Sequence, residues 1–255
     1  MNISILILAL LISSPVWAKK APKPTVPIED TSELTAKSWL VADADNKILA
    51  FKDINTVRPM ASITKIMTVL TIMEAKQDLT QHIAYQKNQW FTREELIGMA
   101  LVRSDNRAAD LLCRNYRGGY GNCINDMNAN AVKYGMHNTT YVDATGLLPD
   151  NTSTATDLLT LLTIAEKNYL INYASTKTKV EIQIKKKWYI FKQTNPLIGH
   201  KHKFIVSKTG TTIAAGGCII LSVETERGLR RVIVLGSKDG RTRIPEAEFI
   251  YKHID

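Results

Sequence analysis

The feature that most constrains the fold is a change in the spacing of apolar residues along the chain. Residues 38–51 are typical of two short strands joined by the turn Ala44-Asp45-Asn46. Residues 62–76 form a largely apolar run that is long enough for a buried helix. Apolar residues then recur at helical spacing, which predicts further helices over residues 93–102, 107–116, 119–134 and 153–167.

After residue 167 the spacing changes to that of strands. Two strands are predicted at 179–184 and 188–191, three more at 204–209, 217–224 and 229–237, and a closing helix at 245–253. Strands that are separated along the chain from a block of helices are typical of the α+β class with a mostly antiparallel sheet. We therefore expect the first strand pair and the closing helix to pack on the same sheet.

Residues 1–18 have the features of a secretory signal peptide. The apolar run 3–12 is too short to span a bilayer as an ordinary helix, and Val16 and Ala18 are small residues where signal peptidase cleaves. The first residues carry no Lys or Arg, so an uncleaved membrane anchor is the alternative. Residues 19–36 are predicted to be a Pro- and Lys-rich tether, residues 37–255 the folded domain, and the location periplasmic or secreted.

The chain has a formal net charge of +9. An exported basic protein suits an anionic partner such as a wall polymer or a membrane surface, rather than nucleic acid. Lys177 to Lys203 holds eight lysines and one acid, Glu181. The simplest interpretation of Lys185-Lys186-Lys187 is a solvated hairpin turn, and the alternative is a surface that binds a polymer.

Three cysteines are present: Cys113, Cys123 and Cys218. An oxidising compartment permits disulfides, and Cys113 and Cys123 flank a turn-rich segment, so they could close a small loop between two helices. The spacing alone does not decide this, because it does not define the Cβ geometry. Cys218 lies in an apolar strand and is expected to be a buried thiol. No His or Cys spacing predicts a zinc site.

Three short motifs suggest an activated serine. Ser62 is the only one of twelve serines with a lysine three residues later, Lys65, and the two side chains would share one face of the predicted helix. A serine hydroxyl needs a base to become a nucleophile, and a lysine can serve only when it is neutral. Burial lowers the pKa of a lysine, and so does a neighbouring cation, which Lys208 could supply.

The other two motifs can be explained by structure or by chemistry. In Ser104-Asp105-Asn106, the hydroxyl could relay a proton and the amide could hold the lysine or the substrate, whereas Asp105 or Asn106 could simply cap the next helix. In Lys208-Thr209-Gly210, the first two side chains could bind a carboxylate at a strand end, and Gly210 would let a ligand approach the backbone. An edge strand there could also pair with a peptide.

In this order the motifs are the set found in penicillin-binding proteins and class A β-lactamases. Further segments resemble the D-alanyl-D-alanine carboxypeptidase and endopeptidase family, namely Tyr116–Tyr120, Asn128–Ala131, Gly135–Thr139, Thr145–Leu147, Asn151–Leu158, Thr194–Leu197 and Thr212–Cys218. The resemblance runs from about Ser38 to about Phe249 and is closest to small endopeptidases of the penicillin-binding protein 7 type. It implies a β-lactamase/transpeptidase-like fold, with a five-stranded antiparallel sheet flanked by helices and a helical subdomain.

The resemblance also implies a mechanism on peptidoglycan stem peptides. Ser62 would attack the carbonyl after a D-alanine, Lys65 would accept its proton, and Ser104 and Asn106 would shuttle the proton and position the substrate. The substrate-binding residues would be Lys208 and Thr209 for the carboxylate, with Gly210 and Thr211 beside them. Backbone N–H groups of Ser62 and Thr211 would form the oxyanion hole. Water would release the acyl-enzyme, no metal or organic cofactor would be needed, and β-lactams would acylate Ser62.

Several alternatives stay open at this point. The enzyme could be an endopeptidase that cleaves D-Ala-diaminopimelate cross-links, or a carboxypeptidase that releases free D-alanine. A class A β-lactamase needs a carboxylate base, but the only glutamates between Asn106 and Lys208 are Glu166 and Glu181, and Glu166 lacks the usual E-x-x-L-N surroundings. A non-enzymatic penicillin sensor would not need an intact nucleophile. Because the chain stops at Asp255, neither the second domain nor the membrane-binding helix of many relatives is expected.

Overall fold

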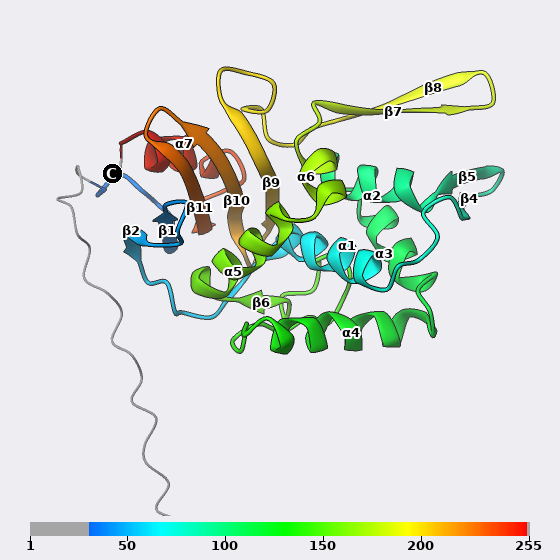
Figure 1. Ribbon diagram of the computed structural model, residues 1–255, viewed down its shortest axis with the longest axis horizontal. Helices are drawn as coiled ribbons and strands as arrows, with labels where there is room; N and C mark the ends of the chain where they lie inside the picture. Colours follow the sequence, from blue (N-terminus) through cyan, green and yellow to red (C-terminus); the bar gives the residue numbers. More distant parts are fainter. Residues whose placement is uncertain (1–30, 254–255) are drawn as a thin grey trace, which may run out of the picture.

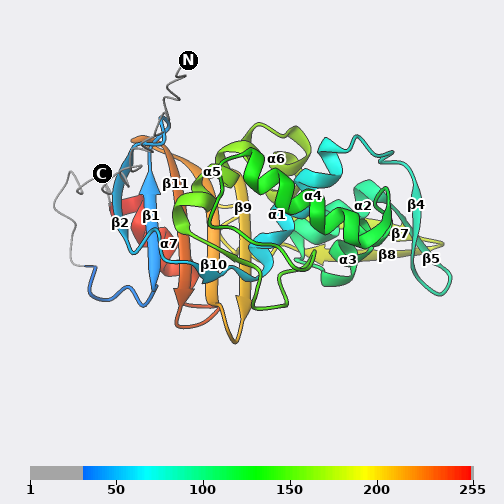
Figure 2. The same cartoon turned by 90° about the horizontal axis from the view of Figure 1, so that it is seen from below.

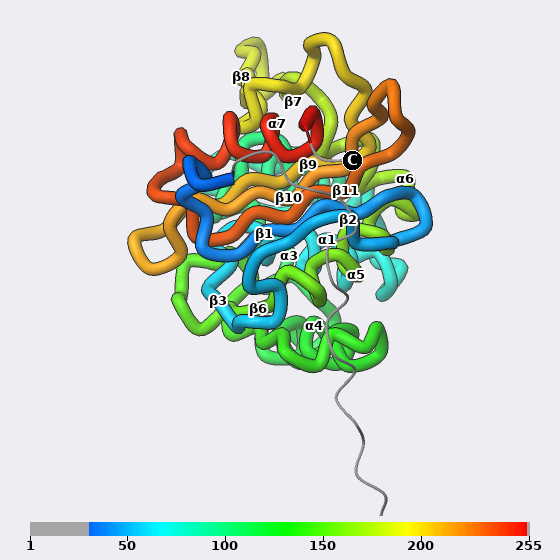
Figure 3. Tube along the Cα trace, turned by 90° about the vertical axis from the view of Figure 1, so that its left-hand side faces the viewer, coloured from blue at the N-terminus to red at the C-terminus, as the bar shows by residue number. Residues whose placement is uncertain are grey.

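A five-stranded antiparallel sheet forms one side of the molecule (Figure 3). The computed structural model describes residues 31–253, so the predicted signal peptide and most of the tether lie outside the described residues. The strand order is β2-β1-β11-β10-β9. The strands are β1 (Ser38–Ala42), β2 (Ile48–Lys52), β9 (Lys203–Thr212), β10 (Gly216–Thr225) and β11 (Gly228–Ser237). Since β1 pairs with β11, both ends of the domain meet in one sheet, as the α+β prediction requires.

Each face of the sheet packs against its own layer of helices. Side chains alternate between the two faces of a strand, so Ile219 and Leu221 join the core under α7 (Arg243–His253). Cys218 and Ile220 face the opposite way, into the larger core with α1 (Thr64–Glu74) and α5 (Ala155–Glu166). The closing helix thus packs on the same sheet as the first strands, which confirms the prediction.

A helical region extends from the far side of α1 (Figure 1). It contains α2 (Arg93–Val102), α3 (Asn106–Arg114) and α4 (Gly119–Lys133), which agree with the predicted helices to within two residues. Capping side chains define two of the starts: Thr92 and Glu95 form a capping box at α2, and Asp105 caps α3. The sequence did not predict α6 (Tyr169–Ser175) or the two short strands β3 (Arg58–Pro59) and β6 (Thr152–Ser153).

Two β-hairpins project from the end of the helical region that lies away from the sheet (Figures 1 and 2). One is β4 (His82–Gln86) with β5 (Gln89–Thr92), which the sequence did not predict. The other is β7 (Lys179–Ile184) with β8 (Lys187–Lys192), and it does not join the main sheet. Lys185 and Lys186 form its turn, so the interpretation as a hairpin turn is confirmed.

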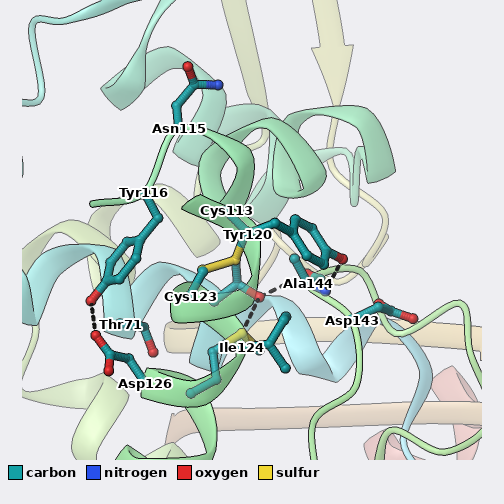
Figure 4. The surroundings of a disulfide bond; sticks show 12 residues. Thr71, Cys113, Asn115, Tyr116, Tyr120, Cys123, Ile124, Asp126, Asp143 and Ala144 are labelled. Atoms are coloured by element: carbon teal, nitrogen blue, oxygen red, sulfur yellow. Dashed lines mark hydrogen bonds between the residues drawn. A yellow bond between two sulfur atoms is a disulfide. The ribbon is translucent and has the colours of Figure 1, made fainter. Parts of the chain in front are cut away.

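A disulfide joins Cys113 of α3 to Cys123 of α4, with the two Cα atoms 5.3 Å apart (Figure 4). The spacing left this pairing open, and the structure forms it. Cys218 is a buried free thiol, as expected, and burial raises the pKa of this thiol to about 11. None of the helices within residues 31–253 has the length and apolar character needed to cross a membrane.

Candidate active site

The three motifs meet where the start of α1, the loop before α3 and strand β9 come together. Ser62 lies in a short 3-10 turn, η1 (Ala61–Ile63), directly before α1, so it precedes the α-helix rather than opening it. The backbone of Ala61 has a positive φ of 49°, a conformation that costs energy for a residue with a side chain. Strain of this kind is often found at functional sites. Ser62 is half-buried, whereas Lys65 is completely buried beneath it.

The Lys65 amine contacts three oxygen atoms. Its Nζ lies 2.8 Å from Ser62 Oγ, 2.8 Å from Asn106 Oδ1 and 2.6 Å from the Thr145 carbonyl oxygen. An ammonium group donates to all three oxygens, but a neutral amine has only two N–H groups and one lone pair. Because Asn106 and Thr145 present pure acceptors, the neutral amine donates to them and its lone pair is left for the hydroxyl proton of Ser62.

Burial lowers the pKa of Lys65 to about 7. The negative charges of Asp143 and Asp105 act in the opposite direction and keep the pKa from falling further. The sequence predicted two causes for a lowered pKa: burial, which is confirmed, and the positive charge of Lys208, which is not among the causes that act on Lys65. Desolvation has the largest effect on Lys65, and the repulsion between the two ammonium groups falls on Lys208.

Lys208 is buried in β9 and reaches Ser104 across the site. Its Nζ donates to Ser104 Oγ and to the Thr209 carbonyl oxygen, both at 2.8 Å. Burial, followed by repulsion from Lys65 and Arg243, holds the pKa of Lys208 well below its usual range. Ser104 has a positive φ of 60°, a second strained residue beside a lysine. The structure therefore places one serine hydroxyl against each buried lysine.

Asp105, between Ser104 and Asn106, has a structural role. Its carboxylate caps α3 by accepting the Ala108 N–H at 2.8 Å, and it also accepts from the Tyr85 hydroxyl. The capping interpretation from the sequence is thus correct for Asp105. It leaves Ser104 and Asn106 facing the two lysines.

The third motif lies inside β9 and not at its end, because β10 continues to pair with this strand as far as Thr212. β9 is an edge strand of the sheet, as the idea of peptide pairing requires. A Cβ on Gly210 would lie 2.9 Å from the backbone nitrogen of Ser62, so only glycine lets β9 come this close to η1. Beside it, the Thr209 hydroxyl is 2.6 Å from the Thr194 hydroxyl, and the Thr211 side chain is exposed.

The sequence analysis missed Asp143, which organises the loop opposite Lys65. One carboxylate oxygen accepts the N–H groups of Thr145 and Gly146 at 2.5 and 2.6 Å, and the other accepts the Leu148 N–H at 2.8 Å. These bonds hold the Thr145 carbonyl against Lys65. Gly146 has a φ of 78° and lies against the Ala61 backbone, where a side chain would collide. An aspartate two residues before a threonine and three before a glycine is a typical side-chain turn, and this signal could have found the loop.

The second missed residue is Arg243, at the start of α7. Its Nη1 donates to the Gly210 carbonyl oxygen at 2.9 Å and to the Thr211 hydroxyl. It therefore anchors the end of β9 that borders Ser62. No local pattern identifies this arginine, since it is separated from β9 by more than thirty residues.

Glu166, the glutamate considered for a β-lactamase, is bonded to residues other than those of the three motifs. Its carboxylate pairs with Arg231 at 2.7 Å and accepts a hydrogen bond from Ser222, and the ion pair is buried. Ser222 lies four residues along β10 from Cys218, the partner of Gly210. Within residues 31–253, no three His, Cys, Asp or Glu side chains gather closely enough to hold a metal ion.

Comparison with known proteins identifies relatives along nearly the whole chain. A family model described as D-alanyl-D-alanine carboxypeptidase matches residues 23–85 and 78–239. The D-alanyl-D-alanine endopeptidase of Pseudomonas aeruginosa is 32% identical over 261 residues, covering 95% of this chain and 84% of the relative. The protein of the same name from Escherichia coli is 34% identical over 242 residues, covering 86% of this chain and 77% of the relative.

Solved structures share the fold. An ampicillin-bound penicillin-binding protein of Listeria monocytogenes superposes with a TM-score of 0.76 at 25% identity, covering 86% of this chain and 97% of the other. A mutant of a Streptomyces DD-transpeptidase superposes with a TM-score of 0.80 at 22% identity, with the same coverage. At the latter identity the likeness concerns the fold alone.

Proposed function

For this chain, a serine peptidase that belongs to the D-alanyl-D-alanine carboxypeptidase family, we propose that Ser62 forms an acyl-enzyme with peptidoglycan stem peptides. We further propose that the bond it cleaves is the D-Ala-diaminopimelate cross-link. The observation that carries the proposal is the contact between Lys65 Nζ and Ser62 Oγ, in which a buried amine of pKa about 7 faces a half-buried hydroxyl.

In the acylation step, neutral Lys65 takes the hydroxyl proton as Ser62 Oγ bonds to the carbonyl carbon of the D-alanine whose peptide bond is cleaved. Asn106 and Thr145 hold the amine in the orientation that leaves its lone pair on Ser62. The developing oxyanion is bound by the backbone N–H groups of Ser62 and Thr211. The close packing of Gly210 against Ser62 supports this arrangement, because it brings the two backbones side by side.

The proton that Lys65 accepted passes to the leaving amine by way of the Ser104 hydroxyl, which is bonded to Lys208, and this returns Lys65 to its neutral form. Water then attacks the acyl-enzyme, with Lys65 again as the base, and releases the shortened peptide. Lys208 and Thr209 bind the carboxylate of the substrate, which lies along the open edge of β9. None of these reaction steps requires a metal or an organic cofactor.

The choice of leaving group rests on similarity. Relatives that cover most of this chain carry the name D-alanyl-D-alanine endopeptidase, at 32% and 34% identity. A carboxypeptidase of Escherichia coli matches at 28% and is covered over 61% of its length. We therefore propose endopeptidase activity, with carboxypeptidase activity as the alternative.

The experiment is a digest of defined substrates with the purified protein without residues 1–18. Cross-linked muropeptide dimers should be converted to monomers, as seen by mass spectrometry, and the Ser62→Ala variant should leave them intact. Loss of the terminal D-alanine from pentapeptide monomers with no cleavage of dimers would assign the chain to the carboxypeptidases instead.

The same proposal includes the location and the inhibitors. Residues 1–18 are proposed to direct export and to be removed after Ala18, which leaves the enzyme periplasmic or secreted. β-Lactams, as mimics of the D-Ala-D-Ala unit, should acylate Ser62 covalently. Labelling with a fluorescent penicillin, absent in the Ser62→Ala variant, tests this point.

A further inference from the structure

The two projecting hairpins enclose a groove that has no part in the site around Ser62. The β4–β5 turn supplies Lys87 to one wall, and the end of the β7–β8 hairpin supplies Lys185, Lys186 and Lys187 to the other. The groove has a volume of about 560 Å³. Figures 1 and 2 both place the two hairpins at the same end of the molecule, away from the sheet.

This groove is strongly basic. No carboxylate lines it within the described residues, and all four lysines are exposed. The nearest acid along the hairpin, Glu181, pairs with Lys179 at 2.8 Å. Glu181 also lies opposite Ile190 in the hairpin, which places it on the face turned away from the groove. An anionic ligand would therefore meet uncompensated positive charge.

The groove also has an apolar lining. Ile184 and Tyr189 belong to its wall, and Tyr189 keeps 36% of its surface exposed. Tyr189 lies opposite buried Ile182 in the hairpin. The preceding residue, Trp188, lies opposite exposed Gln183 and is 63% exposed. Successive residues of a strand point to opposite faces, so Tyr189 faces the groove and Trp188 faces away from it. The groove thus combines an aromatic surface with a ring of ammonium groups.

We propose that this groove binds strands of polymeric peptidoglycan as a second, non-catalytic site, an inference that rests on the proposed function. The carboxylates of stem peptides would pair with the lysines, and a sugar or peptide backbone would cover Tyr189. A second contact on the same polymer raises the local concentration of cross-links at Ser62 without changing the chemistry there.

A lipid surface is the competing occupant, and the shape argues against it. A hairpin that inserts into a membrane interface carries its apolar side chains at the protruding tip. Here the tips are Lys185-Lys186 and Lys87-Asn88, and the aromatic residues lie on opposite faces of the strands behind them. This arrangement suits a polymer that lies along the groove.

The test compares two matched charge reversals in the full chain. Lys186→Glu with Lys187→Glu alters the groove, and Lys47→Glu with Lys167→Glu makes the same charge change at exposed sites near the other end. Lys185 is left unchanged because its positive φ of 57° lies at the turn itself, so that both substitutions stay clear of the residue that defines the hairpin turn. Binding to purified sacculi is measured by co-sedimentation in the Ser62→Ala background, so that the polymer is not digested.

The groove pair should weaken binding about tenfold at low ionic strength, and the control pair should change it less than about twofold. Tyr189→Ala should also weaken binding, with Trp188→Ala as its matched control on the opposite face. If both charge pairs lost the same amount of binding, net charge alone would explain the loss and the proposal would be overturned. Retention on phosphatidylglycerol vesicles in place of sacculi would also overturn it.

Activity assays separate this proposal from the proposed function. With Ser62 intact, the groove pair should cleave a small soluble dimer at the unaltered rate but digest sacculi more slowly. If the protein binds sacculi through the groove but cleaves no soluble dimer, the endopeptidase proposal is refuted and the proposal for the groove is unaffected. A chain that cleaves dimers while both pairs bind sacculi equally would refute the groove alone.

Discussion

Gly210 lies so close to Ser62 that a methyl group on its α-carbon would be 2.9 Å from the Ser62 backbone nitrogen and 3.0 Å from the Met60 carbonyl oxygen. Neither atom belongs to a flexible side chain that could move aside. The glycine of the third motif is therefore needed for the distance between β9 and η1, and not for an unusual backbone conformation, since its φ is not positive.

Gly210→Ala should accordingly abolish most acylation while the protein still folds. We expect the rate of labelling by fluorescent penicillin to fall about a hundredfold, the scale typical of a small displacement in an active site. Gly121→Ala on α4 is the matched control, because a Cβ there meets nothing within 4 Å. That control should acylate normally and gain about 0.5–1 kcal/mol in the free energy of unfolding. Normal acylation by Gly210→Ala would contradict the packing argument.

Acylation should depend on pH through Lys65. Below its pKa of about 7 the amine is an ammonium and cannot accept the Ser62 proton, so the rate should fall about tenfold per pH unit. Above this pH the rate at saturating penicillin should reach a plateau. The measurement is the penicillin acylation rate from pH 5 to 9, and a rate that does not change across pH 7 would remove Lys65 as the base.

Asp143→Asn should separate positioning from charge. The loss of a negative charge lowers the pKa of Lys65 further, so the midpoint of the pH profile should move to lower pH. The amide also cannot accept the Leu148 N–H as the second carboxylate oxygen does, so the plateau rate should fall about tenfold. Asp105→Asn keeps the α3 cap and should shift the midpoint in the same direction without lowering the plateau. Identical plateaus in the two variants would contradict the positioning role.

Glu166→Gln tests the β-lactamase alternative. Because the substitution leaves Arg231 without its buried partner, we expect the free energy of unfolding to fall by about 3 kcal/mol. The lifetime of the penicillin-acylated protein should not change, since the carboxylate is bonded to Arg231 and Ser222. A longer acyl-enzyme lifetime in this variant, measured by release of the label, would show that Glu166 takes part in deacylation.

Removing the disulfide should destabilise the helical region. For a loop of this size, the chain-entropy model gives a loss of about 2–3 kcal/mol for Cys113→Ser with Cys123→Ser. A reductant should lower the melting temperature of the unaltered protein and leave that of the double variant unchanged. If the reductant lowered both equally, the effect would come from another source.

Most of the fold could be predicted from the sequence because its elements have strong periodic patterns. β10 and β11 alternate between two cores, and α1 is almost continuously apolar because it is surrounded on all sides. Short elements escaped prediction. α6 has seven residues, and the β4–β5 hairpin turns at Lys87-Asn88 without glycine or proline, so neither carries a clear local signal.

The motifs likewise predicted which site residues would contact one another, but they did not predict the residues that hold the site in place. Lys65 is hydrogen-bonded to Ser62 and Asn106, and Lys208 is hydrogen-bonded to Ser104, so the three motifs meet as expected. Asp143 and Arg243 act through backbone groups, the Thr145 carbonyl and the Gly210 carbonyl. The turn around Asp143 has a local signal in the sequence, but the approach of the Thr145 carbonyl to Lys65 does not. Nothing local marks Arg243, because its contact with β9 depends on tertiary approach.

The burial of Lys208 links ligand binding to the proton concentration of the surroundings. A carboxylate placed against its Nζ favours the ammonium form, so the binding of an anion should raise the pKa of Lys208. Affinity for anionic substrates then weakens as the medium becomes alkaline, while the Ser62 chemistry, which needs neutral Lys65, weakens as it becomes acidic. The two lysines therefore set opposite limits, and the working range of the enzyme is the interval between them.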